Sequence, residues 1–204
     1  MSTNTLIHRM TRPAVRAIAH TRVTPNHITA LRLVTGVAAA LAFAAGEGLW
    51  PAIGGVVFLF SMLLDRADGE LARQTGKSTP AGYWYDIISD CASNVLAMFG
   101  IGVGLSGRLG VIGPLLGATA GAGIGVLFWQ IFSLKLAQPR GYQLWPGAIV
   151  DPDDALVLVP ICVWSGAAFP MILVAALTTP SMALWLRLRG LRPEGARPES
   201  PGRR

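Results

Sequence analysis

Charged residues are scarce in this chain. They make up 14% of its 204 residues, whereas hydrophobic residues make up 52%. A soluble globular domain usually carries about 25% charged residues. The composition therefore excludes an ordinary soluble domain and indicates a membrane protein.

Cysteine is scarce too, and the two that occur, Cys91 and Cys162, lie in apolar segments without a CxxC partner. We interpret both as buried thiols, which excludes a disulfide framework, a redox motif and a cysteine zinc site. The net charge of +6 suits an anionic membrane surface or a nucleic acid. Since no basic segment is interleaved with aromatic residues, we expect no nucleic-acid partner.

Acidic residues are few, and they are concentrated. The chain has 11 of them against 17 lysines and arginines, and five of the 11 lie in the stretch LLDRADGELARQTGKSTPAGYWYDIISD, residues 63–90. These five are Asp65, Asp68, Glu70, Asp86 and Asp90. Apolar sequence flanks the stretch on both sides, so its carboxylates need a specific explanation.

The apolar sequence divides into segments long enough to cross a bilayer, which takes about 20 residues per helix. We expect an all-α integral membrane protein with six transmembrane helices. The six segments are residues 27–45, 49–73, 81–105, 109–136, 155–169 and 170–186, the fifth being short by this criterion.

Basic residues near the span ends predict the orientation, because lysine and arginine are enriched on the cytoplasmic side. Fourteen of them fall before the first segment, in alternate connections or after the last: Arg9, Arg12, Arg16, Arg22, Arg73, Lys77, Lys135, Arg140, Arg187, Arg189, Arg192, Arg197, Arg203 and Arg204. The other connections hold Arg108 alone. We therefore expect both termini on the cytoplasmic face of a bacterial-type inner or cell membrane.

We expect residues 1–190 to form one membrane domain and the basic, Pro-rich tail 191–204 to be disordered. Residues 1–24 are predicted to form an amphipathic interfacial helix before the first span. Leu6, Met10, Val15 and Ile18 would face lipid in such a helix. The alternative is a basic leader without regular structure.

Helical spacing places the aspartates on two faces. Asp65 and Asp68 share one face of their helix, Asp86 and Asp90 share a face of the next, and Glu70 points elsewhere as a surface charge. The short connection QTGKSTPA predicts that these two helices are antiparallel neighbours. At 1.5 Å per residue Asp65 and Asp90 lie about 12 and 15 Å from the connection, so the four carboxylates can converge.

Four carboxylates at one point repel one another and lose solvation. Protonation, or salt bridges to Arg66 and Arg73, would relieve this, but divalent cations would do so best. Oxygen ligands without cysteine or histidine suit two Mg²⁺ or Mn²⁺ ions, the apparatus used for displacement at phosphorus.

The complete pattern is Asp65-x2-Asp68-Gly69-x2-Ala72-Arg73-x8-Gly82-x3-Asp86-x3-Asp90, eight fixed residues over 26 positions. It resembles the signature of the CDP-alcohol phosphatidyltransferase family at every specified position. The resemblance extends to six spans, to the amphipathic N-terminal segment and to TPNHIT before the first span. It implies transfer of a phosphatidyl or phospho-alcohol unit from a CDP-linked donor, usually CDP-diacylglycerol, to an acceptor hydroxyl with release of CMP.

The resemblance also implies roles for particular residues. Asp65, Asp68 and Asp86 would bind the metals, and Asp90 would act as general base and contact one metal. The donor nucleotide would contact six residues: Gly69, Ala72, Arg73, Thr79, Gly82 and, more weakly, Thr29. The resemblance also implies that this protein forms a homodimer.

Acceptor identity stays open. Lys135, Arg140, Arg187 and Arg189 are candidate contacts for an acceptor phosphate such as that of glycerol 3-phosphate or inositol phosphate, or ordinary anchors at the membrane surface. A same-family enzyme with a soluble CDP-alcohol donor is one alternative function. A cation channel or transporter lined by acids is a more distant one, because it gives the Gly69, Ala72 and Arg73 pattern no role.

Overall fold

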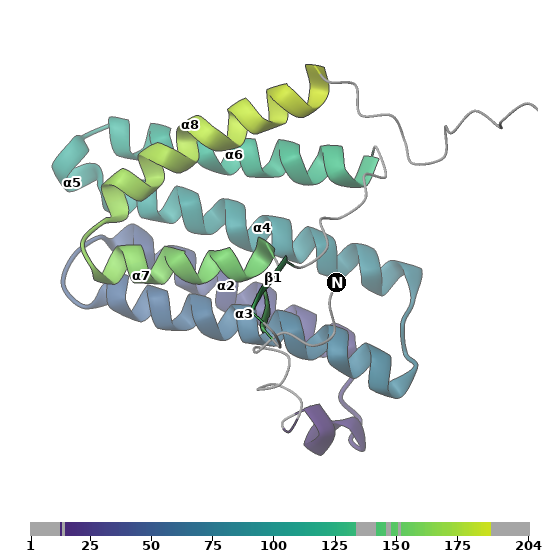
Figure 1. Cartoon of the computed structure of the whole chain (residues 1–204). Coiled ribbons are helices and arrows are strands. Elements are labelled where there is room, and N and C mark those ends of the chain that lie inside the picture. The colour runs from purple at the N-terminus through teal and green to yellow at the C-terminus, as the bar shows by residue number, and fades with distance from the viewer. Residues whose placement is uncertain (1–12, 14, 134–141, 146–147, 151, 189–204) are drawn as a thin grey trace, which may run out of the picture.

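The computed structural model describes residues 13, 15–133, 142–145, 148–150 and 152–188, and the surroundings of side chains for 13, 15–133 and 155–188. Five helices in this part of the chain are long and apolar enough to cross a membrane: α2 (Pro25–Ala45), α3 (Trp50–Thr75), α4 (Pro80–Gly104), α6 (Ile112–Ser133) and α8 (Ala168–Leu188). The all-α prediction is confirmed for these spans, and the two short strands β1 (Tyr142–Trp145) and β2 (Ala148–Val150) form a hairpin outside them (Figure 1).

Six spans are not confirmed. The predicted segment 155–169 forms a six-residue 3₁₀ helix, η1 (Pro152–Val157), and a seven-residue helix, α7 (Leu158–Trp164). Together they rise about 22 Å, less than the roughly 30 Å of a hydrocarbon core. The predicted segment 109–136 is confirmed as a span by α6, and Gly110, at φ 56°, separates α6 from the short α5 (Ser106–Leu109) before it.

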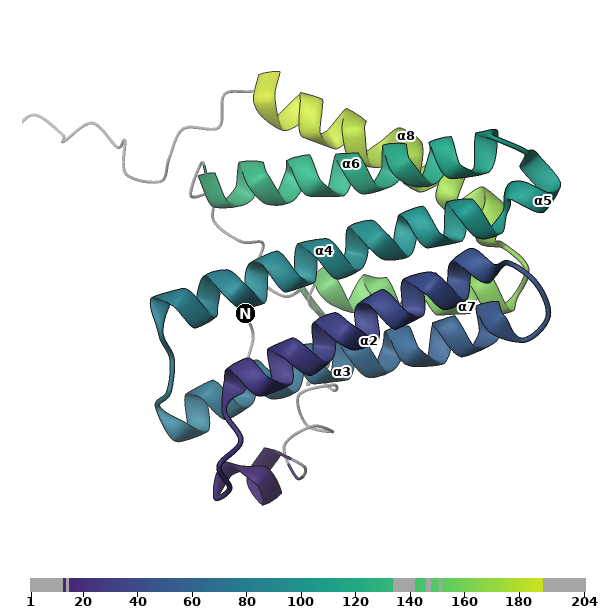
Figure 2. The same ribbon diagram turned by 180° about the vertical axis from the view of Figure 1, so that it is seen from behind.

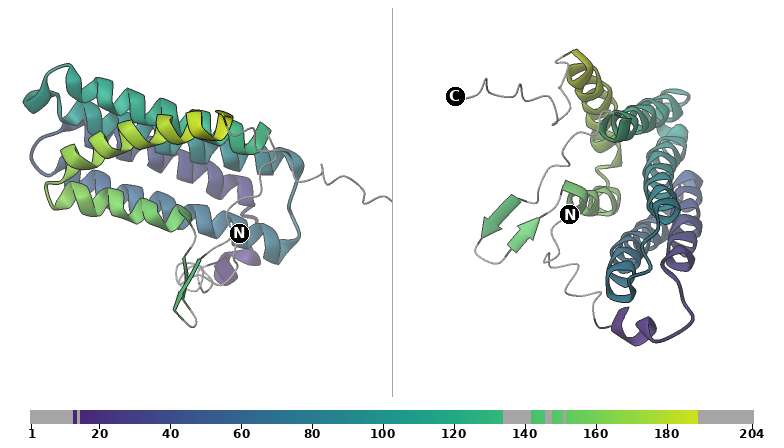
Figure 3. Two further views of the ribbon diagram at one scale, coloured as in Figure 1. Left: turned by 45° about the horizontal axis from the view of Figure 1, so that its top comes forward. Right: turned by 90° about the vertical axis from the view of Figure 1, so that its right-hand side faces the viewer.

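The helices pack as a ring around one core. α2 packs against both α3 and α4, α4 packs against α6, and α6 packs against α8. α7 closes the ring between α3 and α8, where the Trp164 Nε1 donates a hydrogen bond to the Ala52 carbonyl at 3.2 Å. The end-on view in Figure 3 shows this succession. All six helices contribute to the core, with Phe43, Phe58, Met98 and Ile172 among its buried members.

α3 and α4 are not the packed neighbours that the short connection predicts. They run antiparallel on either side of α2 and scarcely touch (Figure 2). A short connection limits the distance between two helix ends, but it does not prevent a third helix from filling the space between them. Acidic residues of α3 and α4 consequently face each other across the first half of α2.

The outward faces of the long helices are apolar, as in a protein that lies in lipid. Aromatic residues gather near both ends, as expected at the two membrane interfaces. Tyr83, Trp84 and Phe132 contact one another with ring centroids 6.1–6.5 Å apart at one end, and Trp50 and Trp164 lie at the other. The five apolar spans and these faces make the chain an integral membrane protein.

The N-terminal segment packs on protein where it is described. Residues 15–19 are helical, and Val15 is fully buried in a cluster with Ile28 and Leu71, with Ile18 packed against it. The prediction that Val15 and Ile18 face lipid is therefore wrong, because α2 and α3 offer them an apolar surface. The interfacial helix is not confirmed; Leu6, Met10, the rest of 1–12 and the tail 191–204 lie outside the described residues.

Close backbone packing predicts one glycine effect on stability. A Cβ added at Gly100 would overlap the Ala40 carbonyl oxygen, whereas one at Gly107 would meet no atom within 4 Å. We expect Gly100→Ala to lower the free energy of unfolding by about 1–3 kcal/mol, since the α2 and α4 backbones must separate. The control Gly107→Ala should change it by less than about 0.5 kcal/mol. Unfolding in detergent measures both, and equal effects would contradict the proposed contact.

Candidate active site at the α2, α3 and α4 ends

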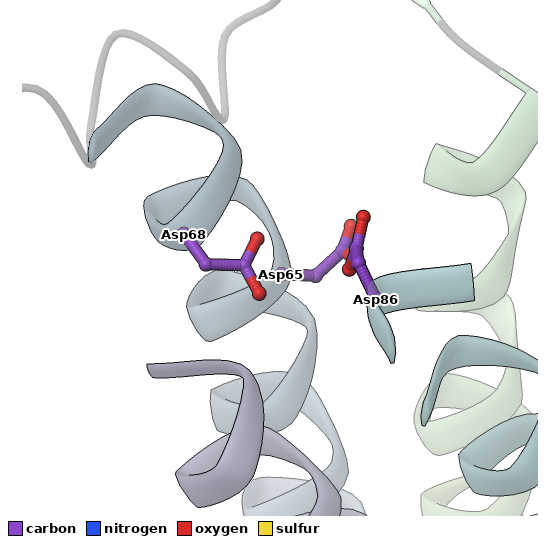
Figure 4. Close-up of side chains that lie close together, drawn as sticks. All are labelled: Asp65, Asp68 and Asp86. Carbon is purple, nitrogen blue, oxygen red and sulfur yellow. The ribbon is translucent and has the colours of Figure 1, made fainter. Parts of the chain in front are cut away.

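Three aspartates converge where α3 ends and α4 begins. Asp65, Asp68 and Asp86 each offer a carboxylate oxygen, and these oxygens lie within 4.8 Å of one another. Figure 4 shows the side chains of α3 and α4 directed toward a common point. Asp68 is buried, and the other two are partly buried. We call these three residues the aspartate trio.

Arg32 of α2 is the cation of the site. Its side chain is only 2% exposed, and its Nη1 lies 2.8 Å from Asp65 Oδ1 and donates a hydrogen bond to Asp86 Oδ1 at 2.6 Å. Its Nη2 lies 2.7 Å from Asp90 Oδ1, although this buried nitrogen has no aligned hydrogen-bond acceptor among the described residues. One guanidinium therefore contacts carboxylates of both α3 and α4.

Asp90 joins the site through Arg32 rather than through the trio. Its Oδ1 accepts a hydrogen bond from Asn94 Nδ2 at 3.1 Å, one turn further along α4. Of the four aspartates predicted to converge, the structure thus brings three into a single candidate metal group. Metal contact by Asp90 stays a prediction.

Thr29 supports the trio from α2, one turn before Arg32. Its hydroxyl lies 2.7 Å from Asp68 Oδ2 and 3.1 Å from the Pro25 carbonyl, and the side chain is 2% exposed. The Thr29 hydroxyl has one proton, and donating it to the nearer acceptor, the Asp68 carboxylate, gives the stronger hydrogen bond. Residues three apart share a helix face. The same face of α2 therefore presents the Thr29 hydroxyl to Asp68 and the Arg32 guanidinium to the other three aspartates.

A first hollow of about 240 Å³ lies beside Asp68 and Asp86. It brings together all six residues predicted to contact a donor nucleotide, namely Thr29, Gly69, Ala72, Arg73, Thr79 and Gly82. A Cβ added at Gly69 would meet only Arg73 Nη1, at 4.0 Å, so the hollow has room above this glycine. The Thr79 hydroxyl accepts a hydrogen bond from the Gly82 amide at 3.0 Å and caps α4.

A second hollow lies on the other side of the carboxylates and shares no lining residue with the first. It is small, about 20 Å³, and Asp65, Asp90, Arg32, Arg66 and Asn94 line it together with Leu156 of η1. The carboxylates therefore form a wall between two spaces, with Asp68 and Asp86 facing one and Asp65 and Asp90 facing the other.

Glu70 is not the surface charge that its position predicts. It is 8% exposed, and its carboxylate lies 2.7 Å from Arg73 Nη2 and 2.9 Å from Gln74 Nε2. Arg73 is therefore engaged by Glu70, at the rim of the first hollow. Arg66 lies 3.8 Å from Asp65, so of the two predicted salt-bridge partners it is the one beside the aspartates.

The predicted acceptor contacts fall mostly outside the described residues: Lys135, Arg140 and Arg189. Arg187 is exposed in the last turn of α8 and lines neither hollow. Their roles stay predictions.

Sequence reasoning missed Arg32, although a signal was present. It is the one Asp, Glu, Lys or Arg residue in an otherwise apolar span, and an ionisable residue inside a membrane helix is by default a candidate for function. Counting basic residues at span ends passes over it. Asn26, Lys77, Ser78 and Tyr83, which also line the first hollow, carry no comparable signal.

The family model for CDP-alcohol phosphatidyltransferases matches residues 22–136. That range is more than half of the chain and contains α2, α3, α4, the four aspartates and Arg32. The chain belongs to the CDP-alcohol phosphatidyltransferase family.

Two curated relatives are similar over parts of the chain. The phosphatidylinositol phosphate synthase of Mycobacterium marinum is 32% identical over 157 residues, 74% of this chain and 62% of that protein. The bifunctional IPC transferase and DIPP synthase of Aquifex aeolicus is 35% identical over 69 residues, 34% of this chain and 15% of that protein. The chain thus spans less than two thirds of either relative.

The fold is that of solved structures of Mycobacterium tuberculosis phosphatidylinositol phosphate synthase. The form with CDP-DAG bound has a TM-score of 0.73 at 20% identity, over 95% of this chain and all of that one. The form in complex with manganese and citrate has a TM-score of 0.66 at 20% identity, over 95% of both chains.

The trio suits a divalent cation. Its ligands are carboxylate oxygens, which hard divalent ions prefer, and they already lie within reach of a single ion. Arg32 supplies one positive charge to the same oxygens. Since a single guanidinium leaves most of the negative charge uncompensated, the residues present fit a divalent ion as well.

The Thr29 hydrogen bond predicts an effect on metal affinity. Thr29→Val keeps the side-chain shape but removes the donor to Asp68, and loss of such outer contacts typically costs about 10- to 100-fold in metal affinity. We expect Mn²⁺ binding, followed by electron paramagnetic resonance, to weaken in that range. Thr29→Ser keeps the hydroxyl and serves as the control. Unchanged Mn²⁺ affinity in Thr29→Val would show that the hydrogen bond does not support the trio.

Proposed function

We propose that this protein transfers a phosphatidyl group from CDP-diacylglycerol to a phosphorylated alcohol and releases CMP, as a step of phospholipid synthesis. One observation carries the proposal: six of the eight signature residues line the first hollow, and the third carboxylate of the aspartate trio, that of Asp65, has an oxygen within 4.8 Å of those of the other two. The phosphatidylinositol phosphate synthases among its relatives support the choice of substrates.

In this proposal the first hollow takes the cytidine diphosphate. The open space above Gly69 lets a bulky group approach the α3 backbone, and Arg73 at the rim supplies positive charge. Thr29, Ala72, Thr79 and Gly82 line the same hollow. The donor's acyl chains would leave sideways into lipid.

Two Mg²⁺ or Mn²⁺ ions are proposed as cofactors, with Asp65, Asp68 and Asp86 as their principal ligands and Asp90 at the edge. Bound there, they would neutralise the diphosphate and stabilise the departing CMP. The manganese complex of the M. tuberculosis synthase supports a divalent ion of this kind.

Asp90 is the proposed general base. It lines the second hollow and not the first, so an acceptor hydroxyl that enters there would meet Asp90 on the side away from the nucleotide. Arg32 and Asn94 fix its Oδ1, and a base must lie within about 2.6–3.2 Å of the proton it removes. Lys135, Arg140, Arg187 and Arg189 stay candidate contacts for the acceptor phosphate.

The site is proposed to face the cytoplasm. The start of α2, the α3–α4 connection and the end of α8 lie at the same end of the bundle (Figure 1), where the basic residues Arg73, Lys77 and Arg187 occur. Residues 152–164 would then be the sixth, short crossing, which leads away from this side, and α8 would return the chain to it. A homodimer is proposed from the family resemblance.

A soluble CDP-alcohol donor is the second candidate. The Asp68–Arg73 motif is compatible with such a donor. An acid-lined cation transporter stays a distant alternative, and metal flux in liposomes without dependence on nucleotide would be its sign.

Release of CMP tests the function. Purified protein in detergent with Mg²⁺ should release CMP from CDP-diacylglycerol when inositol phosphate or glycerol 3-phosphate is present, and less without an acceptor. A panel of acceptors, including free inositol and serine, identifies the preferred one. Release from CDP-glycerol or CDP-inositol only would overturn the choice of donor, and release from no CDP-alcohol would overturn the enzyme proposal.

Two matched substitutions separate the roles of the carboxylates. Asp90→Asn should lower kcat by about 10²- to 10⁴-fold while Mn²⁺ affinity changes little, because it removes a base outside the trio. Asp68→Asn should weaken Mn²⁺ binding itself, since it removes a trio ligand. Isothermal titration with Mn²⁺ and the CMP assay measure both. Near wild-type activity in Asp90→Asn would exclude it as the base.

A further inference from the structure

We propose that Arg32 is a fixed counter-cation of the carboxylate cluster and the positioning residue of Asp90. The part concerning Asp90 rests on the proposed function, whereas the counter-cation part concerns metal binding and stability alone. Arg32 lies outside the signature that runs from residue 65 to residue 90, and it touches three of the signature's four aspartates.

The geometry makes Arg32 the link between two helices that scarcely touch. α3 and α4 lie on either side of α2, and the Arg32 guanidinium contacts Asp65 on one and both Asp86 and Asp90 on the other. These contacts lie at 2.6–2.8 Å, the range of charge-assisted hydrogen bonds and close ion pairs. The rigid, forked guanidinium can reach all three carboxylates at once, which a lysine ammonium cannot do.

Burial makes this charge necessary. Arg32 is only 2% exposed, and its span contains no other Asp, Glu, Lys or Arg residue. A buried guanidinium without partners is strongly unfavourable, and so is a cluster of carboxylates without cations. Before any ion binds, Arg32 and the aspartates therefore stabilise each other, and the cluster keeps its shape.

Arg32 and a divalent ion then share the same oxygens. Its Nη1 contacts Asp65 and Asp86, two members of the trio, so Arg32 lowers the negative charge that an ion would meet. Its Nη2 contacts Asp90, outside the trio. Removing Arg32 should therefore strengthen the attraction for the ion but release Asp90 from its position.

The position of Arg32 also predicts which kinetic constant changes. Arg32 lines the second hollow with Asp90 and does not line the first. Its loss should leave the binding of the CDP-linked donor nearly unchanged and lower the rate of the chemical step.

The first experiment measures melting temperatures in EDTA and in saturating Mg²⁺ for wild type, Arg32→Gln and Gln130→Met. In EDTA we expect Arg32→Gln to have a lower melting temperature than wild type. We expect Mg²⁺ to raise the melting temperature of Arg32→Gln by roughly twice as much as it raises that of wild type, because tighter ion binding adds stability. Gln130→Met removes another buried polar group, whose Nε2 binds the Ala183 carbonyl at 3.0 Å, far along the chain from the cluster. It should show the wild-type rise.

Mn²⁺ titration gives a second readout that does not need catalysis. We expect Arg32→Gln to bind Mn²⁺ at least as tightly as wild type. Weaker Mn²⁺ binding together with an unchanged or smaller Mg²⁺-dependent rise would overturn the counter-cation proposal, because it would mean that Arg32 merely holds the ligands in place. Should Arg32→Gln not fold, Arg32→Lys keeps the charge and should show a wild-type rise.

Kinetics test the positioning of Asp90. With saturating Mg²⁺, we expect kcat of Arg32→Gln and of Arg32→Lys to fall by about 10- to 100-fold, with KM for CDP-diacylglycerol within about threefold of wild type. A raised KM with unchanged kcat, or full activity of Arg32→Lys, would overturn this part. If wild type itself releases no CMP, the proposed function fails while the melting and Mn²⁺ results still decide the counter-cation part.

Discussion

The structure depends on how four carboxylates are accommodated among membrane helices. Asp65, Asp68, Asp86 and Asp90 come from two helices in a chain with 11 acidic residues in all. Each finds a polar partner on α2 or α4: Arg32 for three of them and Thr29 for Asp68, with Asn94 adding a contact to Asp90. Because α2 carries Arg32 and Thr29, its position between α3 and α4 brings both side chains to the carboxylates of the two helices.

The two ends of the bundle answer different physical demands. At the end away from the site, glycines bring backbones together: a Cβ at Gly104 would overlap the Phe43 carbonyl, and one at Gly102 would lie 2.5 Å from the Gly113 carbonyl. Such contacts replace the hydrophobic effect, which does not drive helices together in lipid. The short α7 packs on the early part of α3, away from the site (Figure 1). At the site end, the acidic part of α3 faces α2 and the two hollows that the aspartates line. Close backbone contacts thus hold the helices together at one end, and the hollows that the aspartates line lie at the other.

The long spans could be predicted because hydropathy and bilayer thickness fix their length, and α2, α3 and α4 start within two residues of the predicted limits. The site could be predicted because Asp65, Asp68 and Asp86 follow helical spacing around a short connection. The separation of α3 from α4 could not be predicted, since the length of their connection does not reveal that α2 lies between them. The surface position predicted for Glu70 is wrong, and Arg32 is missed, for a related reason: spacing shows which residues share a helix face, but it does not show which other part of the protein covers that face.

The wall of carboxylates between two hollows agrees with what phosphoryl transfer requires. In a displacement at phosphorus, the attacking and leaving oxygens lie roughly in line, so nucleophile and leaving group approach from different sides. Asp68 and Asp86 face the hollow that holds the predicted nucleotide contacts, and Asp65 and Asp90 face the one that holds the proposed base. An acid-lined channel needs a continuous path for its ion and has no use for this division. The separation of Asp90 from the trio, with Arg32 between them, therefore favours a transferase over a transporter on grounds independent of the signature itself.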